Sequence, residues 1–543
     1  MKIVRRFLLS ILLAMSLLAC SKERQRPNIL LFLVDDYGWI ESSLAFGEQV
    51  YPMNECYHTP NIEALASQGV MMTSAYACPV STPTRTSIMT GMSASRMGIT
   101  SFTSLYKDIC PDAADSSCGY ANPNLTDVFE HPEWNYNALC PEQFADQVER
   151  YGLNRHVVAT PMVKLLRDAG YYTIHVGKAD WAPAGMPGAN PYNMGFMVSI
   201  ADTDNQEVGR YQSEDNGSNN SYTSVQNMAQ YYGTDIHLTE ALTMEAIKSL
   251  ETPIARKEPF FLYLGHYADS TPIGSCEKYY KKYLNSGFDP QFSAYAAMVE
   301  SVDASLGEIL SYLDSKGVAD NTIVIFYSDN GGKNHTQNLP LRAGKASVYE
   351  GGIRVPMIVR WPGKVVADTR INTPVNNEDI FPTILEMAEI DDYKIQQELD
   401  GRSLVRLFTA GSKYVATAQQ RGLITTQREA NRFVVPKSVS GIDPQRPIVV
   451  HYPHQYCVED TPDIDFMSAV RVGDWKLVYR MHEAELELYN LRDDIGERNN
   501  LAARMPEKRD ELATTLSKKL REWDAPMPTI RATAERVPMP DEL

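Results

Sequence analysis

The sequence predicts an α/β protein with a large, mostly parallel central sheet flanked by helices, followed by a smaller C-terminal α+β domain with an antiparallel sheet. Two apolar runs, residues 28–34 and 322–327, have the length of buried strands, and acidic residues follow both. Between residues 160 and 176 a helical pattern, a glycine and a strand pattern form one αβ repeat of a doubly wound sheet. Near the C-terminus, the alternation over residues 468–479 around a Gly-Asp turn predicts an antiparallel hairpin.

The length and charge of the chain limit its possible roles. Its 543 residues are enough for a large and a smaller domain, and we predict them over residues 26–430 and 445–530, with a boundary near Pro447. The net charge of −17 argues against nucleic acid as a partner, because nucleic-acid binding requires a basic face. This charge also disfavours general capture of an acidic glycan, so any anionic substrate must be held by a local cationic pocket.

Residues 1–20 have the pattern of an export signal. Basic residues precede an apolar run over residues 7–18, which is short for a membrane span. The end of this run, Leu17-Leu18-Ala19-Cys20, resembles a bacterial lipobox. We therefore predict an exported protein, in the periplasm or on the outer membrane, anchored through a lipidated Cys20. The alternative is an ordinary signal peptide in which the cysteine is incidental.

Of the eight cysteines, seven remain after Cys20. An odd number leaves at least one thiol free; Cys110 and Cys118 are the closest pair, and the pairing cannot be deduced. The sequence contains no Cys-x-x-Cys pair, so a zinc site of that kind is not expected.

Oxygen-bearing side chains follow both predicted central strands. Asp35 and Asp36 come after the first, and Asp329 and Asn330 after the second. Ligands gather at the carboxyl ends of such strands, so the four side chains converge if the strands are neighbours. This all-oxygen set requires a cation and suits a hard ion, with Ca²⁺ favoured over Mg²⁺ because it accepts more and looser ligands. The alternative is that each acid only caps a turn.

The stretch from Ser81 to Gly91 predicts a helix with a glycine C-cap. Ser81 lies at its start, and Pro83 in the first turn loses nothing by lacking an N–H group. Backbone N–H groups at a helix start favour an anion, and Arg85 adds a permanent charge with a forked donor face. Taken alone, this stretch is also compatible with an ordinary helix cap.

The middle of the chain supplies further elements. Residues 101–155 predict an insertion that forms a rim of the pocket. Lys178 follows the strand of the αβ repeat, where it could meet an anion or be a surface lysine. Residues 294–313 predict a helix whose acids, Glu300, Asp303 and Glu308, form a solvated face.

Two motifs carry a family resemblance that covers most of the mature chain. Ser81-x-Pro83-x-Arg85 followed by Met89-Thr90-Gly91 resembles the signature of the type I sulfatases of the alkaline phosphatase superfamily, in the Ser-type bacterial form. The glycine-spaced string over residues 341–356 resembles the second signature of the family. The small C-terminal domain is also similar.

The resemblance implies an alkaline phosphatase-like fold and sulfate removal from a sulfated glycan. It implies that a maturase oxidises Ser81 to formylglycine, and that Ser81, Asp35, Asp36, Asp329 and Asn330 bind one calcium ion. By the same resemblance Lys345 holds the sulfate, while Arg85 and Lys178 supply further positive charge.

The sequence departs from the family pattern at two positions. The family usually has a histidine two residues after Lys178, where this chain has Asp180, and another at the position of Ser270. Both histidines handle protons in the family, so we expect a substitute. Its candidates are His266, His335, His451 and His454, although structural roles for the last two are comparably plausible. The alternatives are an impaired glycan-binding pseudoenzyme and a phosphate-ester hydrolase with unmodified Ser81.

Overall fold

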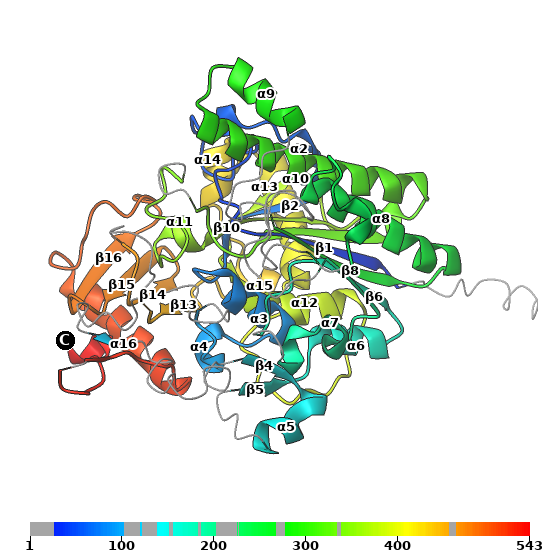
Figure 1. Cartoon of the computed structure of the whole chain (residues 1–543). Helices are drawn as coiled ribbons and strands as arrows, with labels where there is room; N and C mark the ends of the chain where they lie inside the picture. The colour runs from blue at the N-terminus through cyan, green and yellow to red at the C-terminus, as the bar shows by residue number, and fades with distance from the viewer. Residues whose placement is uncertain are drawn as a thin grey trace, which may run out of the picture.

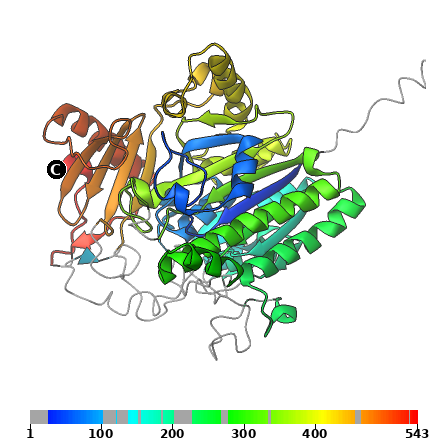
Figure 2. The same ribbon diagram turned by 90° about the horizontal axis from the view of Figure 1, so that it is seen from above.

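The protein forms a large sheet with helices on both faces and a smaller sheet beside it, as the computed structural model in Figures 1 and 2 shows. The structure describes residues 26–101, 120–121, 138–150, 156–182, 186–201, 225, 227–267, 277–333, 338–454, 463–530 and 532–543. The predicted export signal, Cys20, Cys110, Cys118 and most of the predicted rim lie outside these residues. None of the described helices combines the length and the apolar character needed to cross a bilayer.

The large sheet has nine strands and is mostly parallel. Its order is β11-β2-β10-β9-β1-β8-β6-β7, with β12 also pairing with β2, and β10 is antiparallel to both of its neighbours. The strands are β1 (Asn28–Val34), β2 (Val70–Tyr76), β6 (Tyr172–Gly177), β7 (Val198–Ile200), β8 (Phe260–His266), β9 (Thr322–Ser328), β10 (Arg354–Arg360), β11 (Thr369–Ile371) and β12 (Val375–Asn376). The fold class predicted from the sequence is confirmed.

Strand β1 is covered by helices on both faces, which explains its continuous apolar sequence. Leu30, Phe32 and Val34 pack into one helical layer, and the alternate residues Ile29 and Leu31 pack into the other. A strand covered on both faces needs apolar side chains at every position. One layer contains α2 (Pro60–Ser67), α8 (Leu238–Arg256) and α10 (Pro290–Ser315); the other contains α3 (Ser81–Thr90), α6 (Met162–Asp168) and α12 (Ile380–Met387).

The C-terminal sheet is antiparallel, in the order β13-β14-β15-β16. Its strands are β13 (Ile448–Tyr452), β14 (Met467–Val472), β15 (Trp475–Arg480) and β16 (Glu485–Asn490). Helix α16 (Pro506–Glu522) covers one face of this sheet, and the other face packs on the main domain around the short helix α11 (Glu350–Ile353).

Shorter elements complete the described part of the chain. The helices are α4 (Ala94–Met97), α5 (Ala145–Arg150), α7 (Pro191–Met194), α9 (Glu277–Asn285), α13 (Ser412–Gln420), α14 (Gln427–Arg432) and α15 (Lys437–Ser440). The strands are β3 (Tyr120–Ala121), β4 (Ala138–Pro141), β5 (His156–Ala159) and β17 (Thr529–Ile530).

The acids of α10 correct one prediction. Asp303 is 1% exposed and Glu300 is 7% exposed, and among the three acids only Glu308 faces solvent. Asp303 Oδ1 accepts hydrogen bonds from the backbone N–H groups of Asn61 (2.9 Å) and Ile62 (2.8 Å) at the start of α2. The prediction of a solvated face is therefore wrong for Glu300 and Asp303, because α9 and α2 cover this side of α10.

Replacement of Asp303 by alanine should lower the free energy of unfolding by about 1–3 kcal/mol, because it leaves two N–H groups of α2 without their acceptor. Urea denaturation measures this loss, and Glu308→Ala on the exposed face of α10 is the control. Equal stability of the two variants would contradict the capping role of Asp303.

Candidate active site

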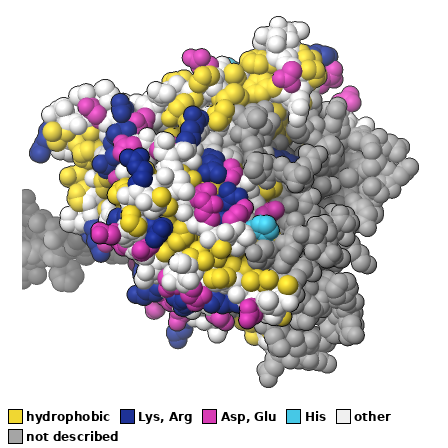
Figure 3. All heavy atoms as spheres, turned by 90° about the vertical axis from the view of Figure 1, so that its left-hand side faces the viewer, with side chains coloured by type: hydrophobic (Ala, Val, Ile, Leu, Met, Phe, Trp, Pro, Cys, Tyr) yellow, Lys and Arg dark blue, Asp and Glu magenta, His cyan; other side chains and the backbone are white. Residues whose placement is uncertain are grey.

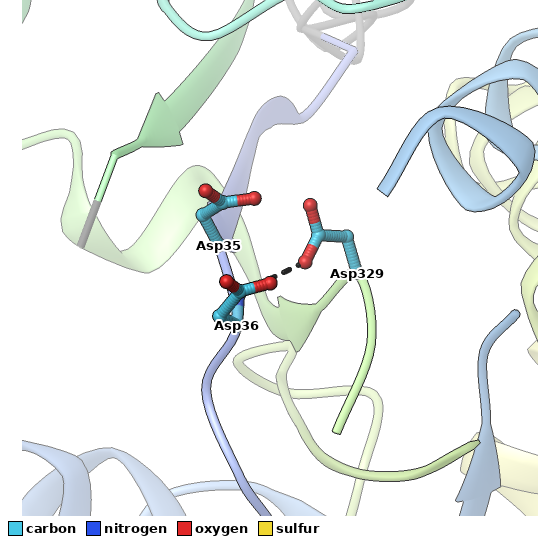
Figure 4. Close-up of side chains that lie close together, drawn as sticks. All are labelled: Asp35, Asp36 and Asp329. Carbon is cyan, nitrogen blue, oxygen red and sulfur yellow. Dashed lines mark hydrogen bonds between the residues drawn. The ribbon is translucent and has the colours of Figure 1, made fainter. Parts of the chain in front are cut away.

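Strand β1 delivers two carboxylates to one place. In a continuing strand the side chains of Asp35 and Asp36 would point to opposite faces. Asp36 instead adopts a left-handed backbone conformation, with φ of 54°, which ends the strand. Carboxylate oxygens of Asp35, Asp36 and Asp329 lie within 4.8 Å of one another, and all three residues are buried (Figure 4).

Strand β9 leads to the other two oxygen-bearing side chains, Asp329 and Asn330. It pairs with β1 in parallel, so the two strands end at the same edge of the sheet, as expected from the sequence. The backbone N–H of Asp36 donates to Asp329 Oδ1 at 3.1 Å, and Asn330 Nδ2 donates to Asp36 Oδ1 at 2.8 Å. The four side chains predicted to converge therefore do so.

Helix α3 brings Ser81 and Arg85 to this edge. The helix begins at Ser81 and ends at Thr90, and Gly91 forms its left-handed C-cap with φ of 70°, so the predicted start and cap are confirmed. Residues four apart lie on one face of a helix. Ser81 Oγ accordingly donates to Asp35 Oδ1 at 2.9 Å, and the Arg85 guanidinium binds Asp329 Oδ2 through Nε at 2.8 Å and through Nη2 at 2.7 Å.

Two lysines complete the group. Lys178, directly after β6, places Nζ 2.7 Å from Asp35 Oδ1 and 3.3 Å from Ser81 Oγ. Lys345 places Nζ 2.6 Å from Asp36 Oδ1. Lys178 is 4% exposed, so it is not a surface lysine. Three buried carboxylates therefore face three cations.

The segment that carries Lys345 is fixed by close backbone contacts. Lys345 N donates to Gly332 O at 3.1 Å, beside the end of β9. A Cβ atom at Gly351 would lie 2.3 Å from Ala343 O, and one at Gly352 would lie 2.2 Å from Ser347 O. Both glycines belong to the short helix α11 and are structural, because no larger residue would fit there.

The charges of the site shift the pKa values of its carboxyl groups in opposite directions. Burial raises the pKa of Asp35, but Lys178, Lys345 and Arg85 outweigh this effect and hold it well below its usual range. Burial and the neighbouring charge of Asp35 raise the pKa of Asp329. Two buried carboxylates that repel each other in this way favour a further cation between them.

The donor set fits a hard divalent ion. Two oxygens that both bind one Ca²⁺ at about 2.3–2.6 Å lie at most about 5 Å apart, and the carboxylate oxygens of the triad meet this limit. The amide oxygen of Asn330 lies 3.2 Å from Ser81 Oγ and adds a neutral ligand of the kind that calcium accepts. Arg85, Lys178 and Lys345 already balance the three carboxylates. A bound divalent ion would therefore make the net charge of the site positive, which favours binding of an anion.

Asp180 lies beside the start of α3. It has a left-handed backbone, with φ of 55°, and its Oδ1 accepts a hydrogen bond from Thr82 Oγ1 at 2.8 Å. Its carboxylate thus binds the residue that follows Ser81 in α3. Ser270, the other position at which the family has a histidine, lies outside the described residues, as does His335.

The structure does not support the predicted catalytic role of His266. The side chain is fully buried, and Nε2 lies 3.0 Å from Ser305 Oγ on α10. Tyr263, three positions earlier in β8, binds Arg85 on the opposite face of the sheet. Alternation along the strand therefore turns His266 away from Ser81, and burial lowers its pKa to about 3.

The two C-terminal histidines are held by other groups. Both ring nitrogens of His451 have partners, Ser468 Oγ at 2.6 Å and Pro526 O at 2.8 Å, which indicates a structural role. His454 Nε2 lies 2.7 Å from Thr100 Oγ1. Burial lowers the pKa of His451 to about 4 and that of His454 to about 3, so both rings are neutral near pH 7.

Two residues of the site gave no signal in the sequence. The hydroxyl of Tyr263 accepts a hydrogen bond from Arg85 Nη1 at 3.0 Å, but a tyrosine within an apolar strand looks like any core residue. Thr82, which binds Asp180, lies within the Ser81 motif and could be found only through its partner.

Replacement of Arg85 by methionine should lower the free energy of unfolding by about 3–5 kcal/mol, because it leaves buried carboxylates uncompensated. The double variant Arg85→Met/Asp329→Asn should regain part of this loss, since it also removes a charge. Urea denaturation in the presence of EGTA keeps divalent ions from masking the effect. A double variant no more stable than Arg85→Met would refute this charge balance.

Comparisons with known proteins agree with this geometry. The family model "Sulfatase" matches residues 27–390. A sulfatase from Formosa agariphila is 28% identical over 588 residues, which cover 97% of this chain and 96% of that protein. Rat N-acetylgalactosamine-6-sulfatase is 29% identical over 399 residues, which cover 71% of this chain and 66% of that protein.

Solved structures share the fold. The crystal structure of Ps i-CgsB matches with a TM-score of 0.65 at 23% identity, covering 91% of this chain and 93% of that one. PsFucS1 sulfatase from Pseudoalteromonas sp. matches with a TM-score of 0.60 at 18% identity, covering 95% and 93%. Because the family model extends from β1 to beyond α12 and includes both acid-ended strands and α3, the chain belongs to the sulfatase family.

Proposed function

We propose that the protein hydrolyses sulfate esters of a glycan, through a formylglycine formed from Ser81 and with one bound calcium ion. The observation that carries this proposal is the position of Ser81 Oγ. It lies 2.9 Å from Asp35 Oδ1, 3.2 Å from Asn330 Oδ1 and 3.3 Å from Lys178 Nζ, among metal-binding oxygens and next to a cation.

Ser81 needs activation, because a serine hydroxyl is a poor nucleophile. A maturase that passes two hydrogens of the side chain to its own oxidant would convert it into an aldehyde, and hydration would then give two hydroxyl groups. One hydroxyl attacks sulfur and the alcohol leaves with a proton. The second hydroxyl loses its proton, the aldehyde forms again, and sulfate leaves. The net reaction consumes one water and produces an alcohol and sulfate.

Asp35, Asp36, Asp329 and Asn330 would hold the calcium ion. When bound, the ion lowers the pKa of the attacking hydroxyl and attracts the sulfate oxygens. Lys178 and Lys345 then no longer have to neutralise the carboxylates alone, so their ammonium groups can bind the sulfonyl oxygens. Arg85 keeps Asp329 in place through its two hydrogen bonds.

The leaving alcohol needs a proton donor. His266 points away from the site, and the ring nitrogens of His451 are both engaged. Of the substitutes expected from the sequence, His335 follows Asn330 by five residues and lies outside the described part of the chain. We retain it as the first residue to test for this role.

A sulfated glycan is the proposed substrate class. Ps i-CgsB was also solved in complex with k-i-k-neocarrahexaose, and another structural neighbour in complex with its substrate D-glucosamine-2-N,6-O-disulfate. On the face in Figure 3, acidic side chains lie among the basic ones. This mixture agrees with an anion held locally by Lys178, Lys345 and the ion rather than by a general basic surface.

The location of the protein is also proposed. An export signal with the lipobox-like Leu17-Leu18-Ala19-Cys20 favours an exported lipoprotein, in the periplasm or on the outer membrane. Anchoring through lipidated Cys20 would place the enzyme where extracellular glycans arrive.

The Ser81 peptide from protein made in its native host should be lighter by two hydrogens and should form a hydrazide adduct. Mass spectrometry measures both. Ser81→Ala should abolish sulfate release, whereas Ser87→Ala, which removes another buried hydroxyl of α3, should retain it. An unmodified serine would contradict the formylglycine. If such a protein hydrolyses phosphate esters, it is a phosphate-ester hydrolase; if it hydrolyses neither phosphate nor sulfate esters, a binding role is favoured.

Removal of divalent ions with EGTA should abolish sulfate release and lower the Tm, and Ca²⁺ should restore both, because the buried carboxylates then regain their cation. Calorimetric titration should give one site. Asp36→Asn should weaken calcium binding at least tenfold, while Glu41→Gln, a buried acid on the loop after β1, should not. Full activity in EGTA would exclude the ion from the mechanism.

A further inference from the structure

A polar pocket opens where the main domain meets the C-terminal sheet. We call it the seam pocket. Trp39, Ser74 and Arg354 line it from the main domain, and Arg471, Asp474 and Arg492 line it from the C-terminal sheet. The pocket is partly open to solvent and small, of a size that suits a small ion or a single carboxylate group. None of the residues assigned to the Ser81 site lines it.

Arg471 is the unusual residue of this pocket. It projects from β14, is 6% exposed, and stacks on the ring of Tyr76 at 5.2 Å. Its Nε donates to Gly473 O at 2.8 Å and its Nη1 to the hydroxyl of Tyr76. Among the described residues, no carboxylate lies within 4.0 Å of this guanidinium, and Nη2 has no acceptor. A buried arginine normally has an ionic partner.

The neighbouring charges do not supply that partner. Glu350 binds Arg354 at 3.0 Å and Lys476 at 2.9 Å, and Glu497 binds Lys476 at 2.8 Å. Arg471 reaches Glu350 only through the hydroxyl of Tyr76, which donates to Glu350 Oε2 at 2.8 Å. Three buried cations thus share two buried carboxylates, and Arg471 is the one that no carboxylate contacts directly.

The mouth of the pocket has no spare carboxylate either. Glu48 binds both Arg432 at 2.6 Å and Arg428 at 3.2 Å, and Asp474 binds Arg492 at 2.7 Å. The rim therefore offers no counterion to Arg471.

Other unused donors lie in the same wall. Asn372 accepts hydrogen bonds at Oδ1 from Thr73 (3.1 Å) and Ser74 (2.6 Å), which leaves its amide N–H groups without a partner among the described residues. Trp39 Nε1 is buried and likewise lacks an acceptor there. An oxygen-rich anion would suit these donors beside a cation that no carboxylate contacts directly.

We propose that the seam pocket binds a small oxyanion, a sulfate or a carboxylate, through the guanidinium of Arg471 and the amide of Asn372. The ion neutralises Arg471 and strengthens the contact between the C-terminal sheet and the main domain. It can come from free sulfate or from an acidic sugar. This site is separate from the Ser81 centre and does not depend on the proposed hydrolysis.

Thermal unfolding tests the proposal on the full-length protein. Sodium sulfate and sodium glucuronate are each compared with sodium chloride at matched ionic strength, so that general screening is constant. At saturating anion the Tm of the wild type should rise by roughly 2 °C or more. Arg471→Met should lose at least half of this rise, and Arg471→Lys, which keeps the charge but not the forked donors, should be intermediate. A response to sulfate alone identifies the free ion as the source, and a response to glucuronate alone identifies the acidic sugar.

Two further measurements separate anion binding at Arg471 from a general change in stability. In chloride, the Tm of Arg471→Met should lie closer to the Tm of the wild type than that of Arg354→Met does, because of these two residues only Arg354 has a carboxylate partner. A crystal of the wild type soaked in selenate should show an anomalous peak within hydrogen-bond distance of Arg471. The proposal is overturned if Arg471→Met responds to both anions as the wild type does, or if the seam pocket shows neither a selenate peak nor, in a crystal soaked in glucuronate, density for the acidic sugar.

Discussion

The site depends on the balance of three buried carboxylates by three cations at one edge of the main sheet. Asp35, Asp36 and Asp329 could not share this space without compensation, since Coulomb repulsion is weakly screened in the interior. Each has a nearby cation, and each cation comes from a different segment of the chain. The arrangement explains why the acids, Ser81 and the lysines meet although they are far apart in sequence.

Much of this arrangement is predictable because it follows from local rules. Strand β1 is an apolar run at every position, and parallel strands that pair must end at the same edge. Helix α3 has a proline in its first turn and a left-handed glycine after its end, so its limits can be read from the sequence. Lys345 is identified through a family resemblance and not from its own pattern.

Other features cannot be read from the sequence, because they depend on which surface covers a residue. The acids of α10 look solvated until α2 and α9 are placed against them. His266 resembles a catalytic base by residue type, but strand alternation turns it toward Ser305. The partners of Arg85 come from three segments, and nothing in the strand that contains Tyr263 marks it as one of them.

The contact between Glu350 and the C-terminal sheet has a consequence for the folding of the whole chain. Lys345 lies just before α11, and α11 is held by Glu497, which accepts a hydrogen bond from Glu350 N at 2.7 Å, and by Lys476. One apolar cluster joins residues around α11 to β13 and β14. Loss of the small sheet would open this cluster, leave Glu350 without Lys476 and loosen the segment of Lys345. We therefore expect the C-terminal part to unfold together with the segment that carries Lys345 rather than as an independent module.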